Sequence, residues 1–263
     1  MKNKKTETLK VGRIGSYPTT YLNTAGKYAF EICKHDLIQS YIVSPSFKGR
    51  PLIVQGLKGI ITYRAWPRSK FPQSFIKVFH NFFWIIYLIL IQIRAIVFFI
   101  GKELHIVHIH SQMYTLVAFW ARITSKKVVI TFHGEDFNNL MRSKTLQRFL
   151  NIYNKIFIIS PEMRDGIKKY FKGGIIYTPN GVDNSVFRNL SLKRKRVLLC
   201  VGSFKKVKQH ELLIDAFSRL KSIQAFADYE LWLAGEGELK ETIMQKSENL
   251  SLDKSVVFLG NLT

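Results

Sequence analysis

Apolar and polar positions along the first 188 residues alternate between two kinds of segment, without a repeat of fixed period. Short apolar runs, many rich in Ile and Val, predict strands at Leu9–Gly15, Leu37–Val43, Gly59–Ala65, Leu104–His110, Lys127–Phe132, Lys155–Ser160 and Gly174–Thr178. Stretches with helical spacing lie between them, roughly at residues 26–34, 75–101, 114–124, 140–152 and 162–171. Strands that alternate with helices are joined by crossovers and lie parallel, so the pattern predicts a doubly wound α/β sheet.

The strand–helix pattern stops and then restarts near residue 188. Turn-forming residues at Pro179–Asp183 and a basic tract at Lys193–Arg196 separate the two parts. The second part has predicted helices at 209–221 and 237–249, and predicted strands at Val197–Val201, Glu230–Ala234 and Val256–Leu259. We therefore expect two α/β domains, residues 1–188 and 189–263. The second is expected to be incomplete, since three strands form a small sheet with an exposed edge.

Residues 82–100 form a long apolar stretch in which Gln92 and Arg94 are the strongly polar residues. At about 100° per residue, one side is wholly apolar and comprises Phe82, Ile85, Ile86, Ile89, Leu90, Ile93, Ile96, Val97 and Ile100. A helix that packs on a sheet or lies in a membrane interface needs this asymmetry, whereas a spanning helix does not. We expect a sheet-packed helix with membrane contact, in which Trp84 and Tyr87 are interfacial anchors; a spanning helix is the alternative.

Composition and charge bear on the class of partner. Hydrophobic residues make up 47% of the chain, which excludes intrinsic disorder, and 40 Lys and Arg against 18 Asp and Glu give a net charge of +22. Residues 1–188 carry +19 and residues 189–263 carry +3. The excess predicts an anionic partner: nucleic acid, an anionic membrane surface or a phosphorylated ligand. A solvated basic face without a specific partner is the alternative.

The cysteines and the N-terminal residues indicate whether disulfides, a zinc module or a cleaved signal are to be expected. Cys33 and Cys200 lie far apart without a C-x-x-C pair, so neither a disulfide framework nor a zinc module is indicated. Residues 1–10 are charged and lack an apolar segment, so we expect no cleaved secretory signal.

A histidine and two acidic residues come directly after an apolar strand: His133, Glu135 and Asp136, with one glycine between the histidine and the acidic pair. Open α/β sheets bind ligands beyond the carboxyl ends of their strands, and a histidine there can exchange a hydrogen bond with a substrate hydroxyl. A strand-end histidine that caps a turn is the alternative interpretation.

Three histidines near residue 108 suggest a metal site, but their spacing argues against one. His108 and His110 lie on one face of a strand and His105 on the other, so the three do not converge. His110 is of interest as a single residue at the carboxyl end of a strand.

Two glycine-containing loops join strands to helices in the second part. Gly202 and Ser203 begin a loop that leads through several lysines to Lys208, and a phosphate could bind such a loop beside a helix N-terminus. Gly235 and Gly237 permit a tight turn after the next strand. A basic surface loop is the alternative for the first, and G-x-G alone is weak evidence for the second.

Seven segments carry a family resemblance: HIVHIHS at 105–111, VVITFHGED at 128–136, IFIISPEMRDGI at 156–167, IIYTPNGVDNSVF at 175–187, LLCVGSFKKVKQHELLIDAF at 198–217, LWLAGEGELKETI at 231–243 and VVFLGNL at 256–262. In this order and spacing they resemble family 4 of the retaining glycosyltransferases. The resemblance implies the GT-B architecture, two facing Rossmann-like domains.

The resemblance also implies site roles. Lys208 matches the family's lysine on the donor diphosphate. His133 matches its cleft histidine near the transferred sugar and phosphates, and we assign His133 as the catalytic residue. Gly26 lies where the family has a glycine-rich loop after its first strand, and Gly235 and Gly237 match the loop near the nucleotide. We assign Gly202 and Ser203 to donor binding as well. His110, Glu135 and Asp136 are expected on the acceptor side.

The chain departs from the family pattern in three places. Ser203 stands where many members have Arg, so Lys205 or Lys206 is expected to replace that cationic contact. The N-terminal glycine pair is reduced to Ala25 and Gly26. The chain ends before the family's E-x7-E segment, so we expect a fragment with reduced or no activity alone.

The resemblance implies sugar transfer from a nucleotide sugar to a saccharide or lipid-linked acceptor with retention, in cell-surface polysaccharide or lipopolysaccharide biosynthesis. No metal or other cofactor is expected, and the expected location is the inner face of the cell membrane. The alternatives are a non-catalytic sugar-nucleotide-binding protein and a basic membrane-associated or nucleic-acid-binding protein. We expect no specific nucleic acid, because the basic residues form no recognisable module.

Overall fold

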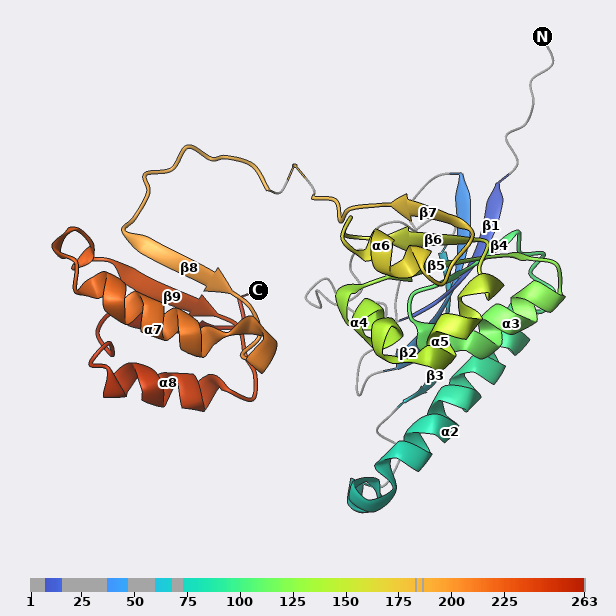
Figure 1. Cartoon of the computed structure of the whole chain (residues 1–263), viewed down its shortest axis with the longest axis horizontal. Helices are drawn as coiled ribbons and strands as arrows, with labels where there is room; N and C mark the ends of the chain where they lie inside the picture. The colour runs from blue at the N-terminus through green and yellow to red at the C-terminus, as the bar shows by residue number, and fades with distance from the viewer. Residues whose placement is uncertain are drawn as a thin grey trace, which may run out of the picture. The chain divides into compact units, whose positions relative to one another are not determined.

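Two compact units make up the chain, residues 1–182 and 183–263 (Figure 1). The computed structural model describes residues 8–15, 37–46, 60–67, 73–182, 184–185 and 187–262. The sequence-based boundary at 188 and the structural one at 182 both fall between the last strand of the first unit and the first strand of the second. Each unit is described by itself below.

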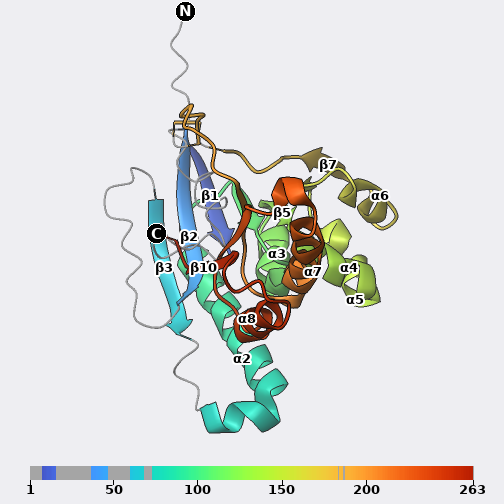
Figure 2. The ribbon, with the colours of Figure 1, turned by 90° about the vertical axis from the view of Figure 1, so that its left-hand side faces the viewer.

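The first unit contains a seven-stranded sheet in the order β3-β2-β1-β4-β5-β6-β7, and all its described strand pairs are parallel (Figure 2). The strands are β1 (Leu9–Ile14), β2 (Ile38–Ser46), β3 (Ile60–Pro67), β4 (Ile106–Ile109), β5 (Lys127–Phe132), β6 (Lys155–Ile158) and β7 (Gly174–Tyr177). The chain runs outward from β1 to β3 and returns with β4 on the other side of β1. The strand order therefore reverses between β1 and β4, where open α/β sheets bind their ligands.

Helices connect the strands from β3 onward: α2 (Gln73–Phe99), α3 (Thr115–Ile123), α4 (Gly134–Arg142), α5 (Lys144–Arg148) and α6 (Met163–Lys168), with short 3₁₀ turns at η2 (Gln112–Tyr114) and η3 (Phe149–Ile152). Alternate strand residues such as Val107, Ile109 and Ile130 are fully buried in one core with α2 and α3. The predicted strands and crossovers are thus confirmed. The helix predicted at 26–34 lies outside the described residues.

The helix after β5 begins earlier than predicted. Gly134, Glu135 and Asp136 form the first turn of α4, with His133 as the N-cap residue, whereas the sequence pattern predicted a helix from residue 140. Carboxylates in a first turn are favoured by the helix dipole, and this outweighs the low apolar content of the segment. The predicted helix over 140–152 is divided into α4, α5 and η3.

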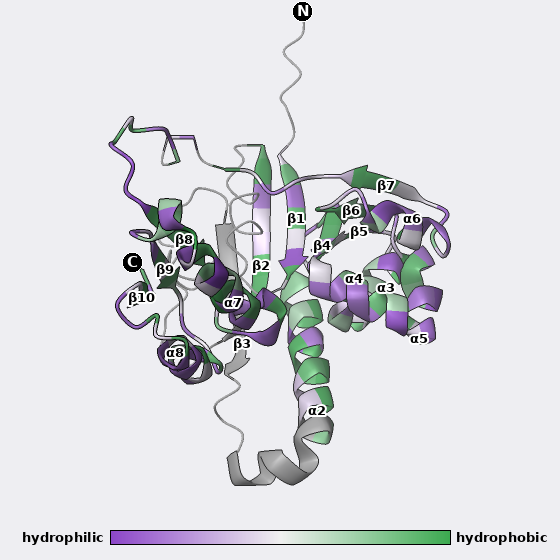
Figure 3. Cartoon of the chain, turned by 60° about the vertical axis from the view of Figure 1, so that its left-hand side comes forward, coloured by the Kyte–Doolittle hydropathy of each residue, from purple (hydrophilic) through white to green (hydrophobic). Residues whose placement is uncertain are grey.

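The buried side of α2 is opposite to the side that the apolar pattern favours. Ile91, Ala95 and Phe99 are buried in the core together with Tyr87. The exposed large side chains belong to the wholly apolar side: Phe82, Ile85, Ile89, Ile93, Val97 and Ile100. Figure 3 shows mostly apolar colouring along the coloured part of this helix. Over the described residues, no helix is long and apolar enough to cross a membrane.

The expectation that Trp84 and Tyr87 anchor the chain in a membrane interface is wrong. Tyr87 is 4% exposed, and Trp84 is half-buried and packs against the core. The two rings stack with their centroids 5.5 Å apart. Both aromatic rings are used in packing α2 onto the sheet.

The second unit contains a three-stranded parallel sheet in the order β10-β9-β8. Its elements are β8 (Val197–Val201), η4 (Lys206–Lys208), α7 (His210–Lys221), η5 (Gln224–Phe226), β9 (Glu230–Ala234), α8 (Lys240–Asn249) and β10 (Val256–Gly260). Phe204, Ile214, Phe217, Leu233 and Ile243 form a core of its own. The alternating elements match the predicted second, smaller Rossmann-like unit.

Candidate functional site

Histidines and a glycine meet at the strand-order reversal of the first unit. His110 follows β4 and Gly15 follows β1, so both lie at the carboxyl ends of the two strands that flank the reversal. A Cβ atom on Gly15 would lie 2.7 Å from Cβ of His110, which leaves no room for a larger residue. The ring of His133, at the end of β5, stacks beside that of His110 at a centroid distance of 6.3 Å. The structure thus brings His110 and His133 together.

A buried chain of polar side chains crosses four strands beneath these histidines. Arg13 on β1 donates from Nε to Ser40 Oγ on β2 at 3.3 Å, and from Nη1 to His108 Nδ1 on β4 at 2.7 Å. His108 Nε2 lies 2.8 Å from Thr131 Oγ1 on β5. Because a guanidinium can only donate, His108 accepts at Nδ1, and its Nε2–H donates to Thr131. The network fixes the tautomer of His108.

All three imidazoles at this edge are held in the neutral form. Burial, reinforced by its neighbours' charges, keeps the pKa of His108 well below its ordinary value, and burial together with Arg13 does the same for His110. Burial also lowers the pKa of the half-buried His133, against the opposing effect of Asp136. A neutral imidazole can accept a hydrogen bond from a hydroxyl group or donate one to it.

The two acidic residues after His133 have different environments. Asp136 accepts a hydrogen bond from Ser111 Oγ at 2.9 Å, which ties the start of α4 to the loop after β4. Burial raises the pKa of Asp136, and the Ser111 hydrogen bond opposes this effect. Glu135 is exposed. Asp136 is therefore placed at the edge with His110 and His133 and helps to hold it together, while Glu135 lies on the surface of the helix.

The two glycine loops of the second unit pack backbone against backbone. Gly235 has φ +142°, and a Cβ there would lie 2.1 Å from the carbonyl oxygen of Gly202. A Cβ on Gly237 would lie 2.6 Å from the carbonyl oxygen of Phe204. Hydrogen bonds from Phe204 N to Glu236 O and from Leu239 N to Phe204 O join the loops. Gly235 and Gly237 thus permit the close contact that shapes the loop after β8.

Cationic side chains follow this interlocked backbone. Lys205, Lys206 and Lys208 are exposed, and the Lys208 side chain passes 3.9 Å from the position of a Cβ on Gly202. The loop that begins with Gly202 and the half-buried Ser203 therefore carries three exposed lysines. Such a combination suits an anionic ligand such as a diphosphate.

His210, which the sequence analysis did not single out, supports this loop. It is buried at the start of α7, stacks on Phe204 with ring centroids 4.6 Å apart, and has Nε2 3.9 Å from Cys200 Sγ. Burial lowers its pKa, and nearby Lys208 adds to this effect. A histidine at the first position of a helix directly after a lysine-rich loop was the signal that could have identified it.

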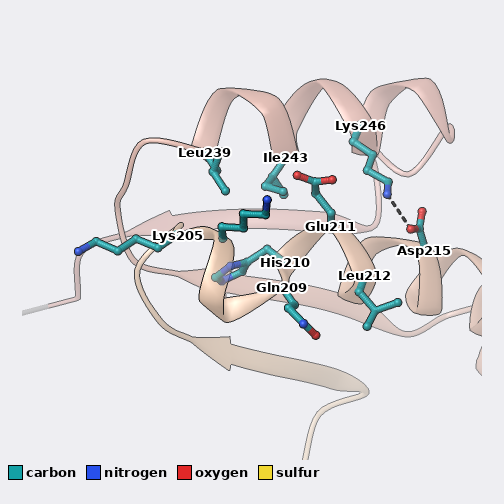
Figure 4. A pocket seen from close by; sticks show the side chains of 10 residues that line it. Lys205, Gln209, His210, Glu211, Leu212, Asp215, Leu239, Ile243 and Lys246 are labelled. Atoms are coloured by element: carbon teal, nitrogen blue, oxygen red, sulfur yellow. Dashed lines mark hydrogen bonds and ion pairs between the residues drawn. The ribbon is translucent and has the colours of Figure 1, made fainter. Parts of the chain in front are cut away.

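A surface hollow of about 370 Å³ lies between α7 and α8 (Figure 4). Lys205, Lys206 and His210 line it at one end, and the Lys246–Asp215 ion pair of 2.7 Å lies at the other. Lys208 is not among its lining residues. The hollow therefore adjoins the predicted donor loop without containing its principal lysine.

The predicted site residues fall into two sets, one in each unit. His110, His133 and Asp136 meet in the first unit, and Gly202, Ser203, Lys208, Gly235 and Gly237 meet in the second. Gly26 lies outside the described residues. Over the part of the chain that the structure describes, no group of three or more His, Cys, Asp or Glu side chains is placed to hold a metal ion.

Curated relatives match part of this chain. The N-acetylgalactosamine-N,N'-diacetylbacillosaminyl-diphospho-undecaprenol 4-alpha-N-acetylgalactosaminyltransferase of Campylobacter jejuni is 28% identical over 142 residues, 50% of this chain and 36% of that protein. The N-acetyl-alpha-D-glucosaminyl L-malate synthase of Bacillus anthracis is 25% identical over 179 residues, 60% of this chain and 46% of that protein. The match thus spans less than half the length of either relative.

Solved structures share the fold. Sucrose-phosphate synthase from Thermosynechococcus elongatus superposes with a TM-score of 0.75 at 14% identity, over 97% of this chain and 71% of that chain. Anabaena HepE in complex with UDP and glucose gives a TM-score of 0.63 at 15% identity, over 97% of this chain and 70% of that chain. At these identities the similarity establishes the fold alone, a GT-B-type pair of Rossmann-like units.

Two family models together cover most of the chain. The model for Glycosyl transferases group 1 matches residues 182–263, which correspond to the second unit. The model for Glycosyltransferase Family 4 matches residues 38–186, more than half of the chain. The chain belongs to Glycosyltransferase Family 4.

Proposed function

We propose that this protein transfers a sugar from a nucleotide-sugar donor to a saccharide or lipid-linked acceptor with retention of the anomeric configuration. The observation that most directly supports this proposal is the close contact between the loops after β8 and β9 of the second unit. Gly235 and Gly237 permit this contact and so shape the backbone ahead of Lys208. Family membership supports the reaction class. HepE was solved with UDP and glucose, and this supports a uridine nucleotide as the first donor to test.

The donor is proposed to bind with its diphosphate at the loop that begins with Gly202 and Ser203. Breaking the bond between sugar and phosphate builds negative charge on the leaving diphosphate. We propose that the ammonium groups and backbone N–H groups of this loop stabilise that charge. Lys208 is assigned to this role, and Lys205 or Lys206 to the contact that an arginine makes in many relatives. We propose that the reaction needs no metal or other cofactor.

The acceptor is proposed to bind at the histidine edge of the first unit. A neutral His133, with His110 behind it, can hydrogen-bond the hydroxyl groups of a sugar or of a lipid-linked saccharide. The Campylobacter jejuni relative is named for a diphospho-undecaprenol compound, which supports a lipid-linked acceptor. The charge of +19 on residues 1–188 supports attachment to the anionic inner face of the cell membrane, in the biosynthesis of a cell-surface polysaccharide or lipopolysaccharide.

Lys208→Ala tests the donor site by titration calorimetry with UDP and UDP-sugars. Loss of one charge-assisted contact is worth about 1.5–3 kcal/mol, so affinity should fall about 10-fold to 150-fold. Lys254→Ala is the matched control, because Lys254 is exposed and lies beside the amino end of β10, away from the glycine loops. It should leave the affinity unchanged.

Turnover is then measured with a donor that binds and with saccharide and polyprenyl-diphosphate acceptors, and NMR spectroscopy of the product reports its anomeric configuration. An inverted product would contradict retention. Donor binding without transfer to any acceptor would instead support a sugar-nucleotide-binding protein. Equal affinity of the wild-type and Lys208→Ala proteins would remove Lys208 from the site.

A further inference from the structure

The outer surface of α2 and α3 carries a row of large apolar side chains that the core does not use. We define the apolar ridge as Ile85, Ile89, Ile93 and Val97 of α2 with Phe119 and Ile123 of α3; each is 40–65% exposed. A few isolated apolar side chains on a surface are normal. Six of them lie on two helices that pack together, and such a concentration is typical of an interaction surface.

The two helices hold the ridge in a fixed orientation. Phe99 of α2 stacks on Trp120 of α3 at a centroid distance of 6.3 Å. Gln92 Oε1 accepts a hydrogen bond from Leu116 N at 2.9 Å, so a buried polar contact also joins the helices. Each helix therefore buries one side in the core and presents its part of the ridge on the other.

The charges around the ridge favour an anionic partner. Between Gln73 and Lys127 the sequence carries six Lys or Arg and a single acidic residue, Glu103. Glu103 forms an ion pair of 2.6 Å with Lys10. Arg122 lies next to Ile123 on α3, and Lys126 follows the end of that helix. A second copy of the same surface would bring like charges together, whereas an anionic lipid bilayer complements both the charge and the apolar side chains.

We propose that the apolar ridge inserts into the headgroup and acyl boundary of an anionic bilayer, with Arg122 and Lys126 beside the lipid phosphates. This inference rests on the proposed attachment to a membrane and names the surface that makes it. Apolar insertion, in addition to the general basic charge, is the source of affinity. Trp84 and Tyr87 do not take part, because they pack toward the sheet.

The test uses the whole chain and sedimentation with vesicles of phosphatidylglycerol and phosphatidylcholine, compared with vesicles of phosphatidylcholine alone. Ile85→Gln, Ile89→Gln and Ile93→Gln are combined in one variant; glutamine is a good helix former, so α2 should stay folded. The ridge variant should bind the anionic vesicles about tenfold or more weakly than the wild-type protein. Leu212→Gln, Ile223→Gln and Leu250→Gln together form the matched control, since these side chains are equally exposed in the second unit.

A separate variant with Arg122→Gln and Lys126→Gln should weaken binding to anionic vesicles and leave the weak binding to neutral ones unchanged. Equal binding of the ridge variant and the wild-type protein would overturn the proposal. It would also be overturned if analytical ultracentrifugation without vesicles showed a wild-type dimer that the ridge variant abolishes, because the ridge would then join two copies. The vesicle assay contains no sugar nucleotide, so a negative result does not contradict the transferase proposal. A negative result in the Lys208 test likewise does not contradict the role of the apolar ridge.

Discussion

The carboxyl edges of the two parallel sheets are built from different chemical groups. In the first unit, the edge is built from side chains: His110 and His133 stack above the buried Arg13–His108 contact, and burial keeps the imidazoles neutral. In the second unit, the edge is built from backbone, and exposed lysines provide its charge. The first edge suits neutral hydroxyl groups, and the second suits an anion.

This difference predicts different sensitivity to substitution. A backbone contact depends on the absence of a side chain, so the smallest addition should disrupt it. A side-chain network depends on each donor and acceptor, so it should respond to loss of a hydrogen bond and to pH.

Gly235→Ala should have the largest effect. The added Cβ would lie 2.1 Å from the Gly202 carbonyl oxygen at a backbone φ of +142°, so both strain and a clash arise. We expect the free energy of unfolding of the second unit to fall by about 3 kcal/mol or more, as measured by chemical denaturation.

Gly202→Ala is the control for that loop, because its Cβ would have ordinary contacts of 3.9 Å with the Lys208 side chain. It should cost less than about 1 kcal/mol. Equal losses for the two variants would show that the loops are not held by the close backbone contact.

Arg13→Met should have the next largest effect, on the first unit. Methionine keeps much of the volume but leaves His108 Nδ1 and Ser40 Oγ buried without their donor. We expect a loss of about 2–3 kcal/mol in the denaturation of the first unit. NMR spectroscopy of the His108 ring should also show that its tautomer is no longer fixed.

Arg122→Met is the matched control, since Arg122 is exposed on α3. It should change the free energy of unfolding by less than about 0.5 kcal/mol. If Arg13→Met were equally mild, the polar chain across the sheet would not stabilise the first unit.

The smallest effect should be a pH dependence of the stability of the first unit. The pKa of His110 is lowered in the folded state, so below about pH 6.5 the unfolded chain binds a proton that the folded chain does not. Stability should therefore fall as pH decreases below 6.5, by up to about 1.4 kcal/mol per pH unit for each such histidine. His110→Asn should reduce the slope of the free energy of unfolding against pH by the contribution of one histidine. The slope is measured by denaturation between pH 5 and 8. An unchanged slope would contradict the burial of a neutral His110.

The sequence predicted the regular elements well because strands in a parallel sheet are short apolar runs bounded by turns. Lys127–Phe132 and Glu230–Ala234 were predicted with the observed bounds. The start of α4 was missed because Gly134, Glu135 and Asp136 are polar and lack helical apolar spacing. Their preference for a first helical turn is electrostatic, and hydrophobic periodicity does not report it.

The site could be predicted only in part. His110 and His133 were placed at strand ends, and the same face for His108 and His110 is confirmed by rings 4.2 Å apart. The contact between Arg13 and His108 joins residues that are 95 positions apart. It depends on which strands are neighbours and in what register, and a single sequence does not contain that information.

The exposed row on α2 follows from the hydrogen bonds of one buried glutamine. Gln92 donates from Nε2 to Leu88 O at 3.1 Å, while its Oε1 accepts from Leu116 N at the start of α3. Rotating α2 about its axis to hide the row would break the bond to α3 and bring Phe99 to the surface. Gln92 therefore sets the rotational phase of the helix, and a lone polar residue decides which hydrophobic residues remain outside the core.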